Sequence, residues 1–372
     1  MDLGWLTPFC ISFALCVMTI VLNRTASAQL KDLNAVQAMH VRPTSRFGGV
    51  AVLIVFVAGL LAGPYRSDPV VLLSITCVSP IVFVGVREDA GYHLTPVWRL
   101  LAAICSALRA FFGYGLVIEN LGFPQFDFLF QHQAVAIAFT VFVLTGVTHS
   151  FNLMDGLHGL CGFTSAVIAV ALALISMENQ QDVVAQELTL LVAALLGFLI
   201  LNFPRGLLFL GDAGATSIGF ILACVALKLM QSNTDLSPWA IALVFFWPMA
   251  DTILAIVRRV TRKQAAMKPD RMHFHHVVMR AFEILVLRKK NRAISNPVAT
   301  VILLPLISAP SIVGVVFWNR DGLALSATVI FAVLFLASYQ ALVRRAQHRL
   351  GVVLGGGFRS TTTLNHRGGI SE

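Results

Sequence analysis

The chain has 372 residues, of which 57% are hydrophobic and only 12% are charged, and its mean hydropathy is +0.81. This composition excludes a soluble globular enzyme and predicts an integral membrane protein. The formal net charge of +9 is first explained by basic cytoplasmic loops and only then by an anionic ligand. A nucleic-acid partner is not expected, because the sequence contains no soluble basic module.

Eleven apolar stretches approach the roughly 20 residues that a helix needs to cross a bilayer. They are residues 3–22, 48–64, 70–86, 97–118, 134–151, 157–177, 186–202, 207–230, 237–257, 297–318 and 322–343. We therefore predict an all-α polytopic membrane protein with about eleven transmembrane helices in one integral membrane domain, residues 1–345. A basic cytoplasmic loop is expected at 258–296 and a polar, disordered cytoplasmic tail at 346–372.

The distribution of Lys and Arg predicts the orientation of the chain in the membrane. Basic residues gather after the first apolar stretch, after the ninth and in the C-terminal tail. These three segments share the cytoplasmic side only if the N-terminus is periplasmic and the C-terminus is cytoplasmic. The same orientation places every polar motif described below on the cytoplasmic side.

The first polar motif is NLMDGLHG, residues 152–159, at the junction of two apolar stretches. An acid beside hydrocarbon costs on the order of 2.5–3.5 kcal/mol on insertion scales, so Asp155 is expected to have a function. Asn152 lies three residues earlier, and a helical backbone would aim both side chains at one point. An ordinary polar turn is the alternative, because Asn, Asp and Gly favour turns.

The second polar motif is LGDAGATSIG, residues 210–219, which places Asp212 at the start of another apolar stretch. Its small residues alone would indicate a helix-packing motif, but they would not explain the acid. The two acidic, glycine-rich motifs together predict a hard cation, Mg2+, that holds phosphate oxygens.

Two shorter stretches are ambiguous. Glu88 and Asp89 are adjacent carboxylates that can share a metal ion or raise one pKa by repulsion, although a solvated loop with Arg87 as ion-pair partner has the same sequence. Thr44 and Arg46 precede a pair of glycines, and this stretch can either bind an anion or simply begin a helix.

A cluster of histidines follows the ninth apolar stretch in KPDRMHFHHVVMR, residues 268–280. The H-x-H-H spacing suits zinc, but no Cys or acid completes a tetrahedral set nearby in the sequence. The surrounding Arg and Lys residues fit a diphosphate better. A basic juxtamembrane segment that contacts anionic lipid is the alternative.

Taken together and in this order, the motifs resemble the polyprenyl-phosphate N-acetylhexosamine-1-phosphate transferases of glycosyltransferase family 4. The resemblance runs from about residue 40 to residue 300. The stretch PDRMHFHH resembles the P-D-R-x-H-x-H-H loop of the WecA-like branch, rather than the H-H-H-x-E pattern of the phospho-N-acetylmuramoyl-pentapeptide transferases.

The resemblance implies a role for each motif. Mg2+, or Mn2+ in its place, would be bound by two side chains: Asn152 and Asp212. The catalytic carboxyl groups would be those of Glu88, Asp89 and Asp155. The substrates would be contacted at the lipid phosphate, the uracil, the diphosphate and the sugar by Thr44, Arg46, His158, Phe209, Arg271, His273, His275 and His276.

Two positions depart from the family pattern. The paired acid is usually Asp-Asp, and here its first member is Glu88, so Asp89 is the stronger catalytic candidate. His158 stands where the pattern N-x-x-D-G-x-D-G has its second Asp, which is implicated in contacts with uridine.

The implied reaction transfers N-acetylhexosamine-1-phosphate, with GlcNAc as the default sugar, from a UDP-sugar to undecaprenyl phosphate and releases UMP. It would initiate a lipid-linked envelope glycan such as O-antigen, in the bacterial inner membrane, with the active site facing the cytosol. The expected partners are the UDP-N-acetylhexosamine, undecaprenyl phosphate and membrane lipid, and a homodimer is left open. The alternatives are a secondary transporter of an anionic solute and an inactive family member.

Overall fold

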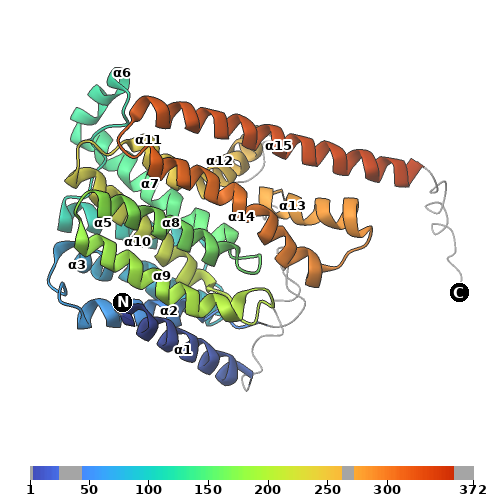
Figure 1. Cartoon of the computed structure of the whole chain (residues 1–372), viewed down its shortest axis with the longest axis horizontal. Coiled ribbons are helices and arrows are strands. Elements are labelled where there is room, and N and C mark those ends of the chain that lie inside the picture. The colour runs from blue at the N-terminus through green and yellow to red at the C-terminus, as the bar shows by residue number, and fades with distance from the viewer. Residues whose placement is uncertain (1–2, 25–43, 262–271, 356–372) are drawn as a thin grey trace, which may run out of the picture.

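The computed structural model describes residues 3–24, 44–261 and 272–355, and every regular element in these ranges is a helix. The all-α prediction is therefore confirmed for the described residues. Figure 1 shows the elements, which are η1 (Leu3–Trp5), α1 (Leu6–Arg24), α2 (Gly48–Ala62), α3 (Pro69–Cys77), α4 (Ser79–Asp89), α5 (Pro96–Tyr114), α6 (Pro124–Asp127), η3 (Phe128–Gln131), α7 (Gln133–Met154), α8 (Leu160–Glu178), α9 (Asp182–Asn202), α10 (Gly211–Ser232), α11 (Pro238–Val244), α12 (Phe246–Thr261), α13 (Phe274–Phe282), η4 (Glu283–Leu287), α14 (Arg292–Val316) and α15 (Asp321–Gly355).

By length and composition, fewer than eleven of the described helices qualify as membrane spans. In the described part of the chain, eight are long and apolar enough, with α3 and α4 counted as one, and the bent pair α11–α12 would be a ninth. The remaining two predicted stretches form apolar helices that are shorter, Leu6–Leu22 and Gly48–Ala62. All eleven stretches are thus helical, while length and composition support eight or nine spans.

The apolar stretch predicted at 237–257 forms two helices, because α11 and α12 meet at an angle of 82°. Pro248 has no N–H with which to bind the carbonyl of Val244, four residues earlier, so the helix loses a hydrogen bond at this point. The hydroxyl of Ser311 on α14 donates to that carbonyl instead, at 3.1 Å. A broken helix is tolerated in a membrane protein when a neighbour satisfies the freed backbone group.

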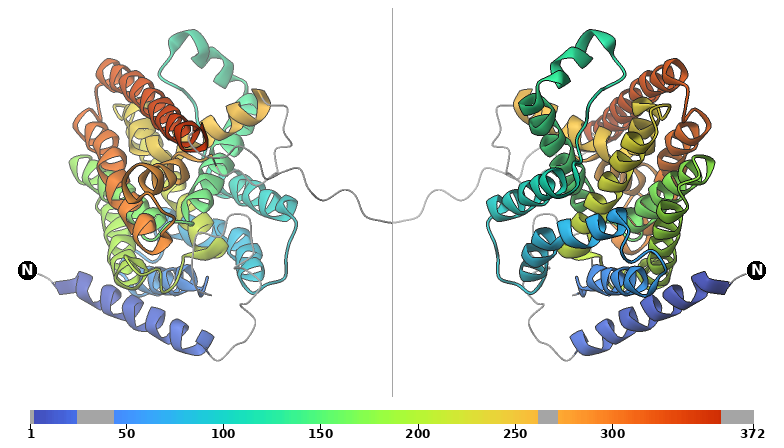
Figure 2. Two further views of the ribbon diagram at one scale, coloured as in Figure 1. Left: turned by 90° about the vertical axis from the view of Figure 1, so that its right-hand side faces the viewer. Right: turned by 90° about the vertical axis from the view of Figure 1, so that its left-hand side faces the viewer.

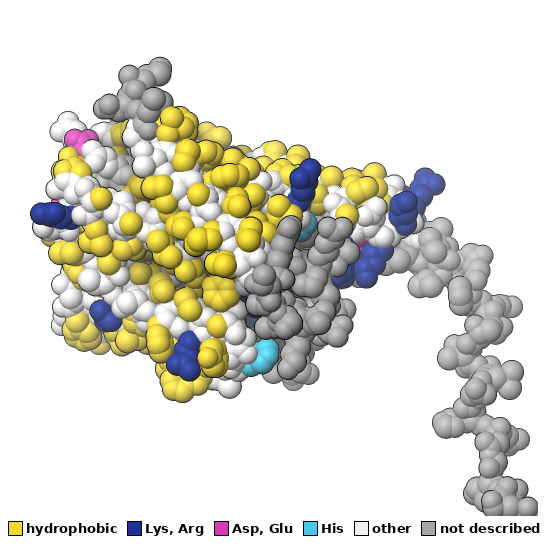
Figure 3. Space-filling model, turned by 90° about the horizontal axis from the view of Figure 1, so that it is seen from below, with side chains coloured by type: hydrophobic (Ala, Val, Ile, Leu, Met, Phe, Trp, Pro, Cys, Tyr) yellow, Lys and Arg dark blue, Asp and Glu magenta, His cyan; other side chains and the backbone are white. Residues whose placement is uncertain are grey.

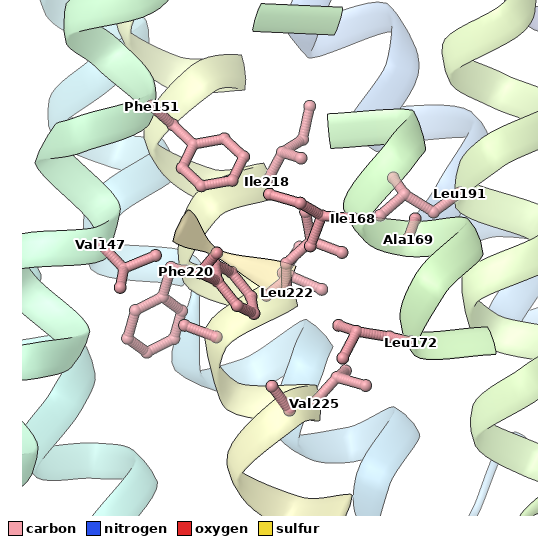
Figure 4. Close-up of a cluster of buried hydrophobic side chains, with 14 of the residues drawn as sticks. Val147, Phe151, Ile168, Ala169, Leu172, Leu191, Ile218, Phe220, Leu222 and Val225 are labelled. Atoms are coloured by element: carbon pink, nitrogen blue, oxygen red, sulfur yellow. The ribbon is translucent and has the colours of Figure 1, made fainter. Parts of the chain in front are cut away.

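Helix α10 lies at the centre of the bundle, and 89% of the residues in its apolar stretch are buried. Glycines let neighbouring helices come close to it: a Cβ on Gly85 of α4 would lie 2.6 Å from the amide nitrogen of Ala213. Figure 4 shows the apolar side chains that fill the space beside α10, including Phe151 from α7 and Ile168 from α8. This close packing fixes the position of the N-terminus of α10, on which the polar residues converge.

The outer surface is apolar. Figure 3 shows a face covered largely by hydrophobic side chains with few charged groups between them. Large apolar side chains such as Phe112 and Phe142 are 77% and 68% exposed. Such a surface is unfavourable in water and suits the hydrocarbon of a bilayer, which agrees with a multi-pass membrane protein.

Helix α13 and the far end of α15 lie at the same end of the bundle (Figures 1 and 2), and the guanidinium of Arg349 donates to the carbonyl of Leu285 at 2.9 Å. Two segments that were predicted as loop and tail are partly helical here. The basic loop predicted at 258–296 contains α13, η4 and the start of α14, because these residues are amphipathic and pack on the bundle. The tail predicted from residue 346 begins as helix, since α15 continues to Gly355.

Candidate active site

The N-terminus of α10 is the point where the predicted acids meet. The two carboxylate oxygens of Asp89, at the end of α4, accept hydrogen bonds from the amides of Asp212 and Ala213, both at 2.9 Å. Asp155, at the end of α7, accepts from the amide of Gly211 at 2.7 Å. The first amides of a helix have no partner within the helix and carry partial positive charge. Two carboxylates from other helices satisfy them here.

Gly211 is required at this junction. Its φ is +73°, a left-handed conformation that only glycine adopts readily. A Cβ at this position would lie 2.6 Å from one carboxylate oxygen of Asp89 and would clash with the backbone carbonyl of Arg46. The glycine therefore lets Asp89 and the segment around Arg46 reach the start of α10.

The side chain of Asp212 is held between two guanidinium groups. Its Oδ1 lies 3.1 Å from Nη2 of Arg46, and its Oδ2 lies 2.5 Å from Nη1 of Arg99 on α5. A backbone hydrogen bond positions the segment that carries Arg46: the amide of Phe209 donates to the carbonyl of Ser45 at 2.8 Å. The two arginine side chains remain 38% and 27% exposed, so both can reach a ligand above the carboxylate.

The turn after α7 carries Asn152 and Asp155 as predicted. Asn152 lies in the last turn of the helix, which ends at Met154, and the amide of Asp155 donates to the carbonyl of Asn152 at 3.3 Å. Desolvation raises the pKa of Asp155 to about 8, although the hydrogen bond from Gly211 favours the charged form. In the protein alone, this carboxyl group therefore takes up a proton at neutral pH.

His158 lies in the same turn, and its tautomer is fixed. Its Nδ1 lies 2.7 Å from the carbonyl of Pro204, and a carbonyl only accepts, so Nδ1 carries the proton. Burial lowers the pKa of His158, which leaves Nε2 with its lone pair. The imidazole is 5.8 Å from the ring of Phe209, at an interplanar angle of 58°. Phe209 itself is only 3% exposed.

Some predicted residues lie apart from this cluster. The carboxylate of Glu88 accepts from the amide of Leu94 at 2.7 Å and so closes the loop after α4. Thr44 is half-buried at the start of the second described segment. Arg271 lies outside the described residues.

The histidines at the start of α13 divide into two groups. His276 approaches the turn after α7: a Cβ on Gly156 would lie 3.7 Å from its Cε1. Burial lowers the pKa of His276 well below its usual value, so it is neutral. His275 instead donates from Nδ1 to Oδ2 of Asp251 on α12, at 2.9 Å, and His273 lies beside it. The fold thus places Asp251 beside His273 and His275, although Asp251 is distant from these histidines in the sequence.

The donor types at Asp212 fit magnesium. Among the described residues, Asp89, Asp155 and Asp212 do not form a set of three whose ligand atoms all lie within 4.8 Å of one another. Mg2+ does not need such a cage, because it keeps several waters and binds through one or two carboxylates and the phosphates of a substrate. Asp89 and Asp155 use oxygens to hold α10, and both oxygens of Asp212 lie beside arginines, so Asn152 and Asp212 stay the predicted ligands.

Comparison with known proteins gives the family of this arrangement. The family model described as glycosyl transferase family 4 matches residues 71–230, which include Asp89, Asp155 and Asp212. Over this segment the chain resembles glycosyl transferase family 4, as its motifs predicted.

Curated relatives are 28–29% identical to this chain over the aligned residues. One is the "Probable undecaprenyl-phosphate N-acetylglucosaminyl 1-phosphate transferase" of Bacillus subtilis (strain 168), which is 28% identical over 65% of this chain and 67% of that protein. Two others are named undecaprenyl-phosphate alpha-N-acetylglucosaminyl 1-phosphate transferase. The protein from Salmonella typhi is 29% identical over 63% of this chain and 65% of its own length, and the protein from Escherichia coli (strain K12) is 28% identical over 56% of this chain and 58% of its own length. The chain thus spans about two thirds or less of the length of these relatives.

Two charged residues that make contacts described above were missed by the sequence analysis. Arg99 lies among apolar residues of α5, and a charge inside a predicted span was the signal that could have identified it. Asp251 offered the same signal in α12, since it also lies within an apolar stretch.

Proposed function

We propose that the protein transfers N-acetylhexosamine-1-phosphate from a UDP-sugar to undecaprenyl phosphate, and that it releases UMP and a lipid-linked sugar diphosphate. GlcNAc is the first candidate sugar, because the relatives are named for N-acetylglucosaminyl 1-phosphate transfer. The observation that carries the proposal is Asp212, held between Arg46 and Arg99 at the N-terminus of a buried helix. Guanidinium groups bind phosphate oxygens well, and a carboxylate among them can hold a hard cation.

The two arginines would contribute charge directly. In the protein alone, they neutralise Asp212. When a diphosphate enters, a guanidinium can turn from the carboxylate to a phosphate oxygen, because both side chains are partly exposed. Mg2+ bound by Asp212 and Asn152 would supply further positive charge to the diphosphate. His276 and Arg271 would complete the basic side of the site.

The side chains of Asp89 and Asp155 would position groups rather than act as general bases. Both oxygens of Asp89 already accept backbone amides, and its side chain is fully buried. A phosphate monoester has a second pKa near 6, so the attacking lipid phosphate is mostly a dianion at pH 7. Its oxygen would attack the β-phosphorus of the UDP-sugar directly while the bond to UMP breaks. Correct placement then matters more than a general base.

The prenyl chain of the acceptor needs an apolar surface beside the site. A cavity of about 700 Å3 lies between α7, α10, α12 and α15, and its walls include Phe139, Leu227, Met249 and Phe335. Its lining is almost wholly apolar, which suits part of a prenyl chain. The cavity borders α12, the helix that also carries Asp251.

We further propose the bacterial cytoplasmic membrane as the location, a cytosolic active site, and the first step of an envelope glycan such as O-antigen as the role. The test is a transfer assay with purified protein, undecaprenyl phosphate, Mg2+ and a panel of UDP-N-acetylhexosamines. We expect UMP and a lipid-linked sugar diphosphate in equal amounts. Uptake of a UDP-sugar into proteoliposomes without UMP release would instead indicate a transporter, and neither activity would indicate an inactive family member.

A further inference from the structure

Asp251, His273 and His275 form a compact buried cluster to which no metal has been assigned above. Oδ2 of Asp251 lies 2.9 Å from Nδ1 of His275 and 3.4 Å from Nδ1 of His273. One ligand atom from each residue lies within 4.8 Å of the other two. Zn2+ binds imidazole nitrogen at about 2.0–2.1 Å and carboxylate oxygen at about 2.0–2.2 Å, which puts neighbouring donors of a tetrahedral site roughly 3.3 Å apart. The two measured separations lie on either side of that value.

The polar atoms of this cluster are buried and incompletely satisfied. The three side chains are 0–3% exposed. Among the described residues, no Lys or Arg forms an ion pair with Asp251, and both ring nitrogens of His273 and Nε2 of His275 have no hydrogen-bond partner. A buried carboxylate without a countercharge and buried ring nitrogens without a partner are both unfavourable. A divalent cation between them would neutralise the acid and bind the imidazole of His273.

The surroundings hold the donors in place. Oδ1 of Asp251 accepts from the amide of Phe274 at 2.8 Å, so the carboxylate is oriented by the start of α13. Metal-binding carboxylates and imidazoles are commonly fixed by such outer hydrogen bonds. Without a metal, Nδ1 of His275 donates its proton to Oδ2 of Asp251. Metal binding would displace that one proton, as it does at other histidine sites.

We propose that Asp251, His273 and His275 bind a divalent transition metal of the Zn2+ class, separately from the magnesium donors at Asp212. Two imidazoles and one carboxylate favour Zn2+, Co2+ or Ni2+ over Mg2+, which prefers oxygen ligands alone. The metal would join α12 to the first turn of α13. It would thereby hold His276 against the turn that carries Asp155.

The test measures metal binding by the full-length protein in detergent. The protein is stripped with a chelator and titrated with Co2+, whose visible absorption reports the ligands, and Zn2+ in untreated protein is measured by mass spectrometry. We expect about one equivalent of Co2+ in a four- or five-coordinate site that Zn2+ displaces. Asp251→Asn and His273→Gln should each weaken Co2+ binding by at least about 100-fold, since even outer-shell partners change affinity 10- to 100-fold. His276→Gln is the matched control and should bind Co2+ as the wild type does.

A gain of signal covers the case in which a variant does not fold. His275→Cys replaces one imidazole with a thiolate, and we expect a new sulfur-to-Co2+ charge-transfer band. Equal titrations of the wild type and Asp251→Asn, or no Co2+ binding by the wild type, would overturn the proposal. Asp251 would then only orient His275 by a hydrogen bond. Metal content is measured without any transfer assay, so this outcome and the outcome for the proposed function are independent.

Discussion

Asp89→Asn tests whether this acid positions α10, because the change keeps the size of the side chain and removes its charge. The asparagine oxygen can accept from one amide of α10, but its NH2 group then faces the N–H of the other. One hydrogen bond to a charged acceptor is lost, out of the two at 2.9 Å. Such bonds contribute about 1.5–3 kcal/mol, which corresponds to roughly a 10- to 100-fold loss if α10 is equally important in the transition state.

The assay compares Asp89→Asn with Glu88→Gln in UMP release and in thermal unfolding of the purified protein. Glu88 is the matched control, because its carboxylate accepts only from the amide of Leu94 and a glutamine oxygen can do the same. We expect Asp89→Asn to lose activity and to unfold at a lower temperature, and Glu88→Gln to stay within about threefold of the wild type. A wild-type rate and unfolding temperature for Asp89→Asn, or a larger loss for Glu88→Gln, would refute the reasoning.

Three further predictions follow from the same contacts. Gly211→Ala should lower the unfolding temperature and the rate, because the left-handed backbone costs roughly 1–2 kcal/mol and the new Cβ meets Asp89; Gly113→Ala, where a Cβ has no neighbour within 4 Å, should change neither. Arg99→Gln should lower kcat/KM about 10- to 100-fold, and Arg99→Lys should recover part of it, whereas equal rates for the two variants would argue against a charge at this position. Asp155 has a pKa of about 8 in the folded protein, against 3.8 as a free group. Between about pH 4 and 8 the folded protein therefore holds a proton on Asp155 that the unfolded chain has lost, so the free energy of unfolding falls as the pH rises through this interval. Asp155→Asn should make the unfolding temperature less dependent on pH over that interval, and an unchanged slope would contradict the raised pKa.

The sequence identified the acids of the site because a charge at the edge of an apolar stretch is rarely accidental. Asp155 and Asp212 were found in this way, and the structure brings both to the start of α10. The departure at Glu88 already favoured Asp89, and the structure agrees that only Asp89 reaches this helix. Which side of the membrane the site faces stays a prediction, since it rests on Lys and Arg alone.

Long-range contacts were not predictable from local patterns. Arg99 and Asp251 have apolar neighbours in their own helices, and their importance follows from contacts with α10 and α13. The bend between α11 and α12 depends on Ser311, far along the chain, which supplies the hydrogen bond that Pro248 cannot. Helix-forming residues were recognised throughout, but the path of each helix through the bundle was set by partners distant in sequence.

The most direct measurement follows the β-phosphorus of the donor. UDP-GlcNAc labelled at that phosphorus is incubated with undecaprenyl phosphate, Mg2+ and either the wild-type protein or Asp212→Asn. We predict that the wild type moves the label into the lipid fraction with one UMP released per label, and that folded Asp212→Asn does not. Transfer by Asp212→Asn at the wild-type rate, or a wild type that leaves the label in the water-soluble fraction, would contradict the account.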